Sequence, residues 1–149
     1  MIWNKQTGKK YYSVQEKIKH YSSMLERKDI SLDKKKLAKQ RLIELKAIDN
    51  CLYDEPTMII TDDKYFGNPS SKLRACVVVG VDNKQQLLAC PVRKRTIKTV
   101  ILENDTDRQM DSTVKILKRK DVYETKNISG LASLTSGDKK KIKAIHGKK

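Results

Sequence analysis

The sequence predicts an α+β fold: an N-terminal antiparallel helical hairpin, then a small antiparallel barrel, then a C-terminal helix. Three observations support this order. Residues 1–54 contain two capping signals, each followed by apolar residues at helical spacing. Residues 57–117 break into short apolar runs separated by turn formers, and a basic segment at 138–145 returns to a helical pattern. Short strands between helices favour a small, strongly bent sheet or a barrel.

The first helix is predicted to begin after Ser13. Ser13 and Glu16 have the spacing of a capping box, in which each side chain accepts a hydrogen bond from the other residue's backbone N–H. The apolar residues that follow lie on one stripe at helical spacing: Val14, Ile18, Tyr21 and Leu25.

Ser31 is predicted to cap a second helix, whose apolar stripe contains Ala38, Leu42, Leu45 and Leu52. The link between the helices is only a few residues long, so the two should form an antiparallel hairpin. We expect their stripes to pack on each other and on the remaining chain. The alternative is that one helix face is offered to a partner protein. The pattern changes near residue 54, which divides the chain into a helical hairpin at 1–54 and a barrel domain with a basic C-terminal helix at 55–149.

Five runs are predicted to be strands: 57–61, 73–81, 87–92, 96–102 and 113–117. The run of valines at 77–79 indicates a strand buried on both faces. Strands 73–81 and 87–92 should form a hairpin around Asp82 and Asn83, with paired residue numbers that sum to about 167. Asp62 and Asp63 are interpreted as solubilising loop residues beside a strand.

The charge of the chain favours a polyanionic partner. Lys and Arg number 33 against 18 Asp and Glu, a net charge of +15. Cations displace counterions from a phosphate backbone, which favours nucleic acid over an unspecialised basic surface. Residues 51–107 are neutral, with eight residues of each sign, so the cations at 93–98 are a local feature.

The sequence has no secretory signal and no run of membrane-spanning length, so we expect a cytoplasmic protein without a membrane partner. The three cysteines are widely spaced and include no C-x-x-C pair, and the two histidines stand alone. These spacings argue against a disulfide framework and a zinc site, and we expect neither a metal nor a cofactor.

Arg93-Lys94-Arg95 joins two predicted strands where an ordinary hairpin would place Asn-Gly or Asp-Gly. The cluster is either a solvated basic turn or a phosphate-binding site. The predicted register sets Arg93 beside Arg74, and two adjacent guanidinium groups repel unless an anion lies between them. The alternative is that both reach solvent, or that Glu103 or Glu124 pairs with them. We expect phosphate contacts from five residues: Arg93, Lys94, Arg95, Lys98 and Lys72.

Several motifs resemble those of PemK/MazF-type toxins. They are Leu73-Arg-Ala-Cys-Val-Val-Val-Gly80, a short Asp-Asn turn, Leu87-Leu-Ala-Cys-Pro-Val92, and later Asp121-Val-Tyr-Glu-Thr-Lys-Asn-Ile-Ser-Gly-Leu131. The resemblance covers about residues 56–146 and leaves the helical hairpin outside it.

This resemblance implies a small, usually dimeric barrel that cleaves single-stranded RNA without a metal ion. In the family, the 2′-OH attacks the adjacent phosphate and gives a cyclic phosphate and a 5′-OH. The motif arginine corresponds to Arg74, which would stabilise the charge that develops on the phosphate. RNA, an antitoxin protein and a second copy of the chain are the implied partners.

Two positions depart from the family pattern. Ala75 follows Arg74 where the family has proline, and Arg93 stands where the family has threonine. Thr96 lies near enough in sequence to replace the missing hydroxyl, and Glu124 or Asp121 could act as acid or base if the fold brings it in. The predicted catalytic residues are therefore Arg74, Thr96 and Glu124.

We expect a toxin-type endoribonuclease, so an enzyme is favoured. Two alternatives stay open. The first is a non-catalytic, basic nucleic-acid-binding module with the same barrel, and the second is a protein-interaction device built on the helical hairpin.

Overall fold

The computed structural model describes the chain apart from residues 6, 69–71, 95–98, 103–104, 112, 128–132 and 147–149. At 93–94, 99–102, 105–109 and 127 it describes the backbone alone. The helices in this part are α1 (Val14–Glu26), α2 (Leu32–Asp54) and α3 (Ser136–His146), with short 3-10 helices η1 (Asp63–Phe66), η2 (Arg119–Asp121) and η3 (Thr125–Asn127). The strands are β1 (Ile2–Trp3), β2 (Lys10–Tyr11), β3 (Thr57–Asp62), β4 (Leu73–Val81), β5 (Leu87–Lys94), β6 (Thr99–Leu102), β7 (Asp105–Asp111) and β8 (Lys115–Leu117). A membrane crossing would need a longer and more apolar helix than any found among the described residues.

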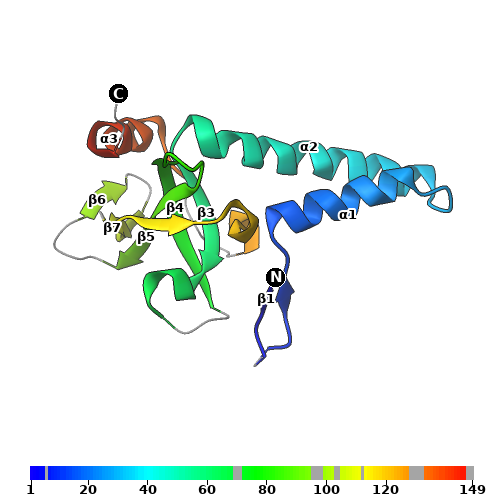
Figure 1. Ribbon diagram of the computed structural model, residues 1–149, viewed down its shortest axis with the longest axis horizontal. Helices are drawn as coiled ribbons and strands as arrows, with labels where there is room; N and C mark the ends of the chain where they lie inside the picture. Colours follow the sequence, from blue (N-terminus) through cyan, green and yellow to red (C-terminus); the bar gives the residue numbers. More distant parts are fainter. Residues whose placement is uncertain are drawn as a thin grey trace.

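Helices α1 and α2 form the predicted antiparallel hairpin, which extends away from the sheet (Figure 1). The capping box of α1 is confirmed. The Ser13 hydroxyl accepts a hydrogen bond from the Glu16 N–H at 3.1 Å, and the Glu16 carboxylate accepts one from the Ser13 N–H at 2.9 Å. Ser31 caps α2 by accepting a hydrogen bond from the Lys34 N–H at 3.3 Å. These caps satisfy backbone donors that the first helical turn leaves free.

The main sheet is antiparallel, with the strand order β3-β4-β5-β7-β6 and with β8 also paired to β5. The predicted register between β4 and β5 is confirmed, because Cys76 pairs with Pro91 and Val78 pairs with Ala89. The register then shifts by one residue between Val78 and Gly80. Such an irregularity increases the local twist of a strand pair.

The described sheet is not closed into the predicted barrel. Closure needs the two outermost strands to pair. Here β3 and β6 stand at opposite ends of the strand order and do not pair within the described residues. The outer side of β3 is instead occupied by the segment after η2, through two backbone hydrogen bonds of 2.7 and 3.1 Å between Ile60 and Tyr123. The α+β class is correct, whereas the closed barrel is wrong.

The basic cluster is not the turn of a β5–β6 hairpin. Arg93 and Lys94 belong to β5 itself, and their backbone partners are Gln109 and Arg108 of β7. Strand β6 pairs with β7 rather than with β5. The sequence did not predict β7, because Asp105-Thr-Asp-Arg-Gln-Met-Asp111 is almost entirely polar and lacks the apolar alternation of a half-buried strand.

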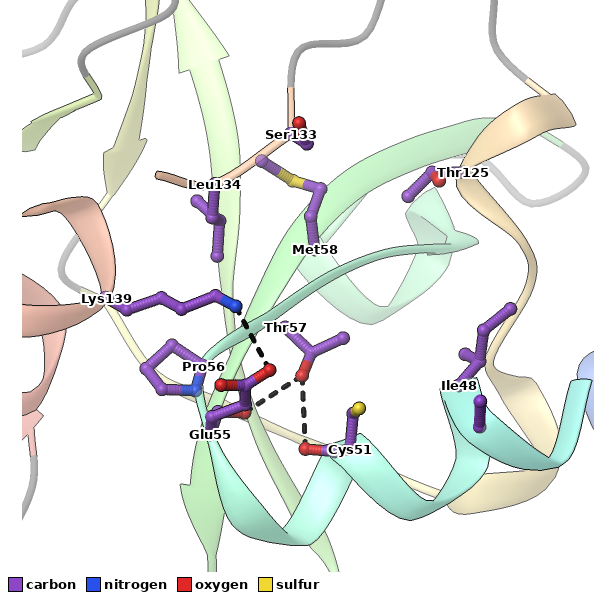
Figure 2. Close-up of a pocket in the computed structure, with 11 residues that line it drawn as sticks. Ile48, Cys51, Glu55, Pro56, Thr57, Met58, Thr125, Ser133, Leu134 and Lys139 are labelled. Atoms are coloured by element: carbon purple, nitrogen blue, oxygen red, sulfur yellow. Dashed lines mark hydrogen bonds and ion pairs between the residues drawn. The ribbon is translucent and has the colours of Figure 1, made fainter. Parts of the chain in front are cut away.

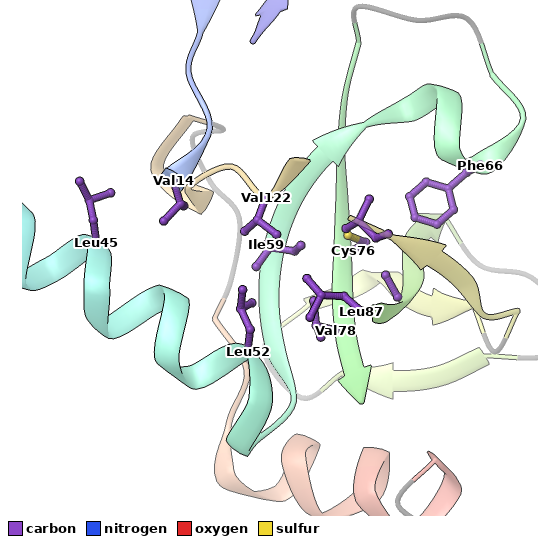
Figure 3. Packing of buried hydrophobic residues seen from close by; sticks show 11 residues of the cluster. Val14, Leu45, Leu52, Ile59, Phe66, Cys76, Val78, Leu87 and Val122 are labelled. Atoms are coloured by element: carbon purple, nitrogen blue, oxygen red, sulfur yellow. The ribbon is translucent and has the colours of Figure 1, made fainter. Parts of the chain in front are cut away.

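Two apolar clusters cover the two faces of β4 and β5, because successive side chains of a strand point to opposite faces. On one face, residues of the helical hairpin pack against the sheet (Figure 3), with Val14, Leu45, Leu52, Ile59, Cys76, Val78, Leu87 and Val122 all buried. On the other face, Ile142 of α3 packs against Ala75, Val77, Cys90, Val92 and Met110. The hairpin and the sheet therefore share a hydrophobic core.

A short β1–β2 ribbon precedes α1 and was not predicted from the sequence. Its two pairs are Ile2 with Tyr11 and Trp3 with Lys10. Ile2 is buried against Ile60 of β3 and Tyr123, which attaches one face of the ribbon to the sheet.

Candidate nucleic-acid interface

Arg74 lies near the start of β4, opposite Thr61 of β3. Its guanidinium forms a bidentate ion pair with Asp63, with Nε–Oδ1 at 2.8 Å and Nη2–Oδ2 at 3.1 Å. The Arg74 side chain is 31% exposed, whereas that of Asp63 is 5% exposed. Hydrogen bonding to Asp63 raises the pKa of Arg74 above its ordinary value, so the group is always charged. Asp63 therefore orients the charged Arg74 guanidinium, and part of the Arg74 side chain remains open to solvent.

Asp63 is held in place by its neighbours. Its N–H donates to the carbonyl of Lys72 at 2.9 Å, and its carboxylate accepts a hydrogen bond from the Asn68 side-chain amide at 3.1 Å. The preceding Asp62 caps η1 by accepting a hydrogen bond from the Lys64 N–H at 3.1 Å. Both aspartates are buried, so their interpretation as solubilising loop residues is wrong. A buried carboxylate requires partners, and here those partners fix the guanidinium.

Asp121 and Tyr65 lie at the same end of β3. The Tyr65 hydroxyl donates a hydrogen bond to the Asp121 carboxylate, and the Thr61 hydroxyl donates one to the Asp121 carbonyl at 2.8 Å. Burial and the neighbouring Asp121 carboxylate raise the pKa of Tyr65 above its ordinary value. Tyr65 is therefore a neutral phenol at physiological pH, and it ties η1 to η2.

Glu124 is placed away from solvent, with 4% of its side chain exposed. Lys17 of α1 contacts its carboxylate at 2.6 Å, and Arg41 of α2 contacts both carboxylate oxygens at 2.8 and 2.9 Å. Burial alone would raise the pKa of Glu124, but the hydrogen bonds from Lys17 and Arg41 outweigh it and lower the pKa below its ordinary value. This carboxylate fastens both helices of the hairpin to the segment that follows η2.

The other predicted site residues are placed only in part. Lys72 is exposed, next to the Arg74 strand end. The backbones of Arg93 and Lys94 lie at the end of β5, two and three residues beyond the Cys76–Pro91 pair. The remaining predicted residues fall outside the described part of the chain: Arg95, Thr96 and Lys98.

A pocket of about 330 Å³ lies where α2, β3 and α3 meet (Figure 2). Its polar groups engage one another: Lys139 pairs with Glu55 at 3.0 Å, and the Thr57 hydroxyl donates to the carbonyls of Cys51 and Glu55. Apolar side chains form much of the remaining wall, including Ile48, Pro56, Met58 and Leu134. The pocket therefore resembles a gap between packed elements of the fold rather than a phosphate-binding site.

No group of three His, Cys, Asp or Glu side chains that could hold a metal ion occurs among the residues that the structure describes. No family model, curated protein or solved structure matches the chain. The resemblance to PemK/MazF-type toxins therefore rests on the quoted motifs alone, and the function has to be inferred from the geometry and charge of the site.

The arrangement around Arg74 can bind an anion. A guanidinium has five N–H donors in a planar fork, and Asp63 engages the edge formed by Nε and Nη2. The Nη1 donors lie on the other edge of the same fork. Since Asp63 neutralises part of the charge, strong binding of a polyanion needs further cations, and Lys72 is the exposed cation nearest in sequence.

Proposed function

We propose that the chain binds single-stranded RNA at the Arg74 end of its sheet and cleaves it as a metal-independent endoribonuclease of the PemK/MazF type. The observation that carries the proposal is the Arg74–Asp63 pair, in which a buried carboxylate orients a partly exposed guanidinium. The net charge of +15 supports a polyanionic substrate. On this proposal the chain is a cytoplasmic toxin that acts as a homodimer and is countered by an antitoxin protein.

Arg74 has the chemistry that such a reaction needs. When a 2′-OH attacks the adjacent phosphate, its proton passes to water, the P–O bond to the next nucleotide breaks, and the departing 5′-oxygen takes a proton from water. Negative charge grows on the phosphate oxygens during this step. A guanidinium already oriented by Asp63 can donate to those oxygens without first being immobilised, so it stabilises the transition state more than the ground state. DNA lacks the 2′-OH nucleophile, which restricts the reaction to RNA.

Glu124 is not part of this proposal. A carboxylate that is nearly unexposed and already accepts hydrogen bonds from Lys17 and Arg41 would have to break a buried ion pair to take a proton from RNA. Its position therefore favours a structural role.

The test is incubation of the purified chain with single-stranded RNA in EDTA, followed by analysis of the product ends. Fragments with a cyclic phosphate and a 5′-OH are expected, and Arg74→Ala should abolish them. Arg27→Ala is the matched control, because Arg27 pairs with Asp29 at the exposed end of α1, where both side chains face solvent. RNA left intact at high protein concentration would exclude the nuclease, and equal loss in both variants would exclude a specific role for Arg74.

A second candidate is a non-catalytic RNA-binding module. It is favoured by two facts: Arg93 stands where the resembled motif has a threonine, and Glu124 is engaged in ion pairs. On this reading the same preparation binds RNA with a steep salt dependence and releases no products.

A further inference from the structure

The β1–β2 ribbon has two chemically different faces. Ile2, on the inner face, is 2% exposed and packs on Ile60 and Tyr123. The next pair, Trp3 with Lys10, points the other way because strand side chains alternate, and Trp3 is 45% exposed. The ribbon therefore anchors one face to the sheet and presents the only tryptophan of the chain to solvent.

The exposed tryptophan is surrounded by positive charge. The ammonium groups of Lys5 and Lys10 lie over the Trp3 ring, 5.6 and 5.7 Å from its centroid. Backbone hydrogen bonds hold the turn of the ribbon, from the Asn4 N–H to the Lys9 carbonyl at 2.9 Å and from the Gly8 N–H to the Asn4 carbonyl at 2.8 Å. Gly8 has φ +74°, a left-handed conformation that favours glycine in this turn. The aromatic surface and its cations therefore stand on a ribbon that is held by backbone hydrogen bonds on both sides of its turn.

Aromatic residues are concentrated in this part of the chain. The sequence has eight aromatic residues, and four of them fall within the first 21 positions: Trp3, Tyr11, Tyr12 and Tyr21. The same segment has five lysines and one acidic residue. Tyr12 is 46% exposed and stands where the ribbon joins α1, at the edge of a groove of about 720 Å³ that Lys19 and His20 also line. The exposed aromatic and basic groups thus continue from the ribbon onto α1.

The ribbon also packs near the start of β4, the strand end that carries Arg74. Leu73, which directly precedes Arg74 in β4, packs against the cluster formed by Ile2, Ile60 and Tyr123. Figure 1 shows the ribbon next to the start of α1, on the side of the sheet where β3 runs. Because Leu73 and Arg74 point to opposite faces of β4, a polynucleotide strand bound at Arg74 would reach the ribbon by passing around the start of β4.

We propose that the β1–β2 ribbon is a stacking platform for single-stranded RNA, in which Lys5 and Lys10 move from the Trp3 ring onto the adjoining phosphates while Trp3 stacks on a base. This inference rests on the RNA binding of the proposed function and adds a second contact to it. Single-stranded nucleic acid offers unpaired bases with free π-faces, and proteins bind it by combining aromatic side chains with cations that follow the backbone. A duplex keeps its bases stacked on each other and offers no such face.

The experiment is a fluorescence titration of the full chain with 2′-O-methyl oligouridylate of about 12 nucleotides, a length in the range of single-strand sites. This probe lacks the 2′-OH nucleophile, so binding is measured without cleavage. Because Trp3 is the only tryptophan, its emission reports on the ribbon alone. We expect the emission to be quenched in step with the fluorescence anisotropy of the same, fluorescein-labelled oligonucleotide.

Two variants test the contacts separately, each with circular dichroism to check folding. Trp3→Ala should weaken binding about tenfold by anisotropy, the size expected for losing one stacked base. Lys5→Gln with Lys10→Gln should weaken binding and reduce its salt dependence. The matched control is Lys36→Gln with Lys39→Gln, which removes the same charge from the exposed face of α2 and should have the smaller effect.

The outcomes separate this inference from the proposed function. Binding by anisotropy without quenching, or with Trp3→Ala unchanged, overturns the ribbon platform and leaves RNA binding at Arg74 standing. Equal quenching by a duplex of the same length overturns stacking as the mode of contact. Failure of the unaltered chain to bind the oligonucleotide at all overturns both proposals.

Discussion

Among the residues that the structure describes, the buried carboxylates of Asp63 and Glu124 both hold cations, and the two ion-pair sites differ in how far those cations are exposed. Asp63 pairs with the guanidinium of Arg74, whose side chain is 31% exposed. Glu124 pairs with Lys17 and Arg41, which come from different helices and are each 20% exposed, and at 3.7 Å with the more exposed Lys126. Both carboxylates are nearly inaccessible to solvent, so in each of these ion pairs the cation is the more exposed partner.

This difference in exposure distinguishes a cation that can bind a ligand, Arg74, from cations that hold parts of the fold together, Lys17 and Arg41. Glu124 joins α1, α2 and the segment after η2. It lies 107 positions from Lys17 and 83 positions from Arg41 in the sequence. Asp63 and Arg74 are only 11 positions apart and belong to adjacent elements. A cation that closes a long-range contact contributes to stability, whereas a cation held locally with its outer edge in solvent is available to a ligand. The same chemistry therefore supports two roles.

The largest effect is expected from Glu124→Gln. This change leaves Lys17 and Arg41 without the negative charge that offsets their partial burial, and it should lower the free energy of unfolding by about 3 kcal/mol. Guanidinium chloride unfolding, followed by circular dichroism, measures the loss.

Glu44→Gln is the matched control for that change. Glu44 also pairs with Arg41, at 2.6 Å, but its side chain is 49% exposed, so the same substitution should cost less than about 0.5 kcal/mol. Equal losses in the two variants would show that Glu124 has no special structural role.

A smaller loss of stability is expected from Asp63→Asn. Arg74 loses its ionic partner, but it is exposed enough to be hydrated, so we expect a cost of about 1–2 kcal/mol. The same unfolding experiment gives the value. A loss as large as that of Glu124→Gln would remove the distinction between the two pairs.

Much of the fold could be predicted from local sequence signals. The capping box at Ser13, the cap at Ser31 and the register of β4 with β5 depend on residues close together in the chain, and all three are confirmed. Strand β7 and the pairing of β6 were missed, because a polar strand has no apolar alternation and strand order is set by packing rather than by local pattern. The β1–β2 ribbon was missed since its strands are two residues each.

The candidate site was less predictable. Arg74 was identified because a charged residue inside an apolar strand needs a partner or solvent. Its partner Asp63 was missed, although pairing the predicted strands 57–61 and 73–81 as an antiparallel pair would have brought it near. Glu124 could not be assigned to Lys17 and Arg41 from sequence, because that contact depends on how the hairpin packs on the sheet.

Acid should progressively weaken the ion pairs that Glu124 forms with Lys17 and Arg41. The pKa of Glu124 is lowered in the folded chain, so its contribution to stability is fully present above the ordinary glutamate pKa and is lost as the pH falls through the lowered value. Below pH of about 4 we therefore expect stability to fall more steeply in the unaltered chain than in Glu124→Gln. Unfolding curves measured across this range test the difference, and parallel pH profiles would show that Glu124 does not titrate with a lowered pKa.

The smallest expected effect, and the most selective, is that of Arg74→Lys on RNA affinity. Lysine keeps the positive charge but cannot form the bidentate pair with Asp63 and donate from a second edge at once. If Arg74 acts only as a charge, the substitution should leave the affinity for 2′-O-methyl oligouridylate unchanged. If it acts as an oriented guanidinium that donates from two edges, the affinity should fall about threefold, which is less than in Arg74→Ala. The salt dependence of binding should stay the same, because the number of cations does not change. Equal affinities of Arg74→Lys and Arg74→Ala would mean that Asp63 holds the added lysine away from the phosphate, which would assign the Arg74–Asp63 pair to structure and leave RNA binding to other cations of the chain.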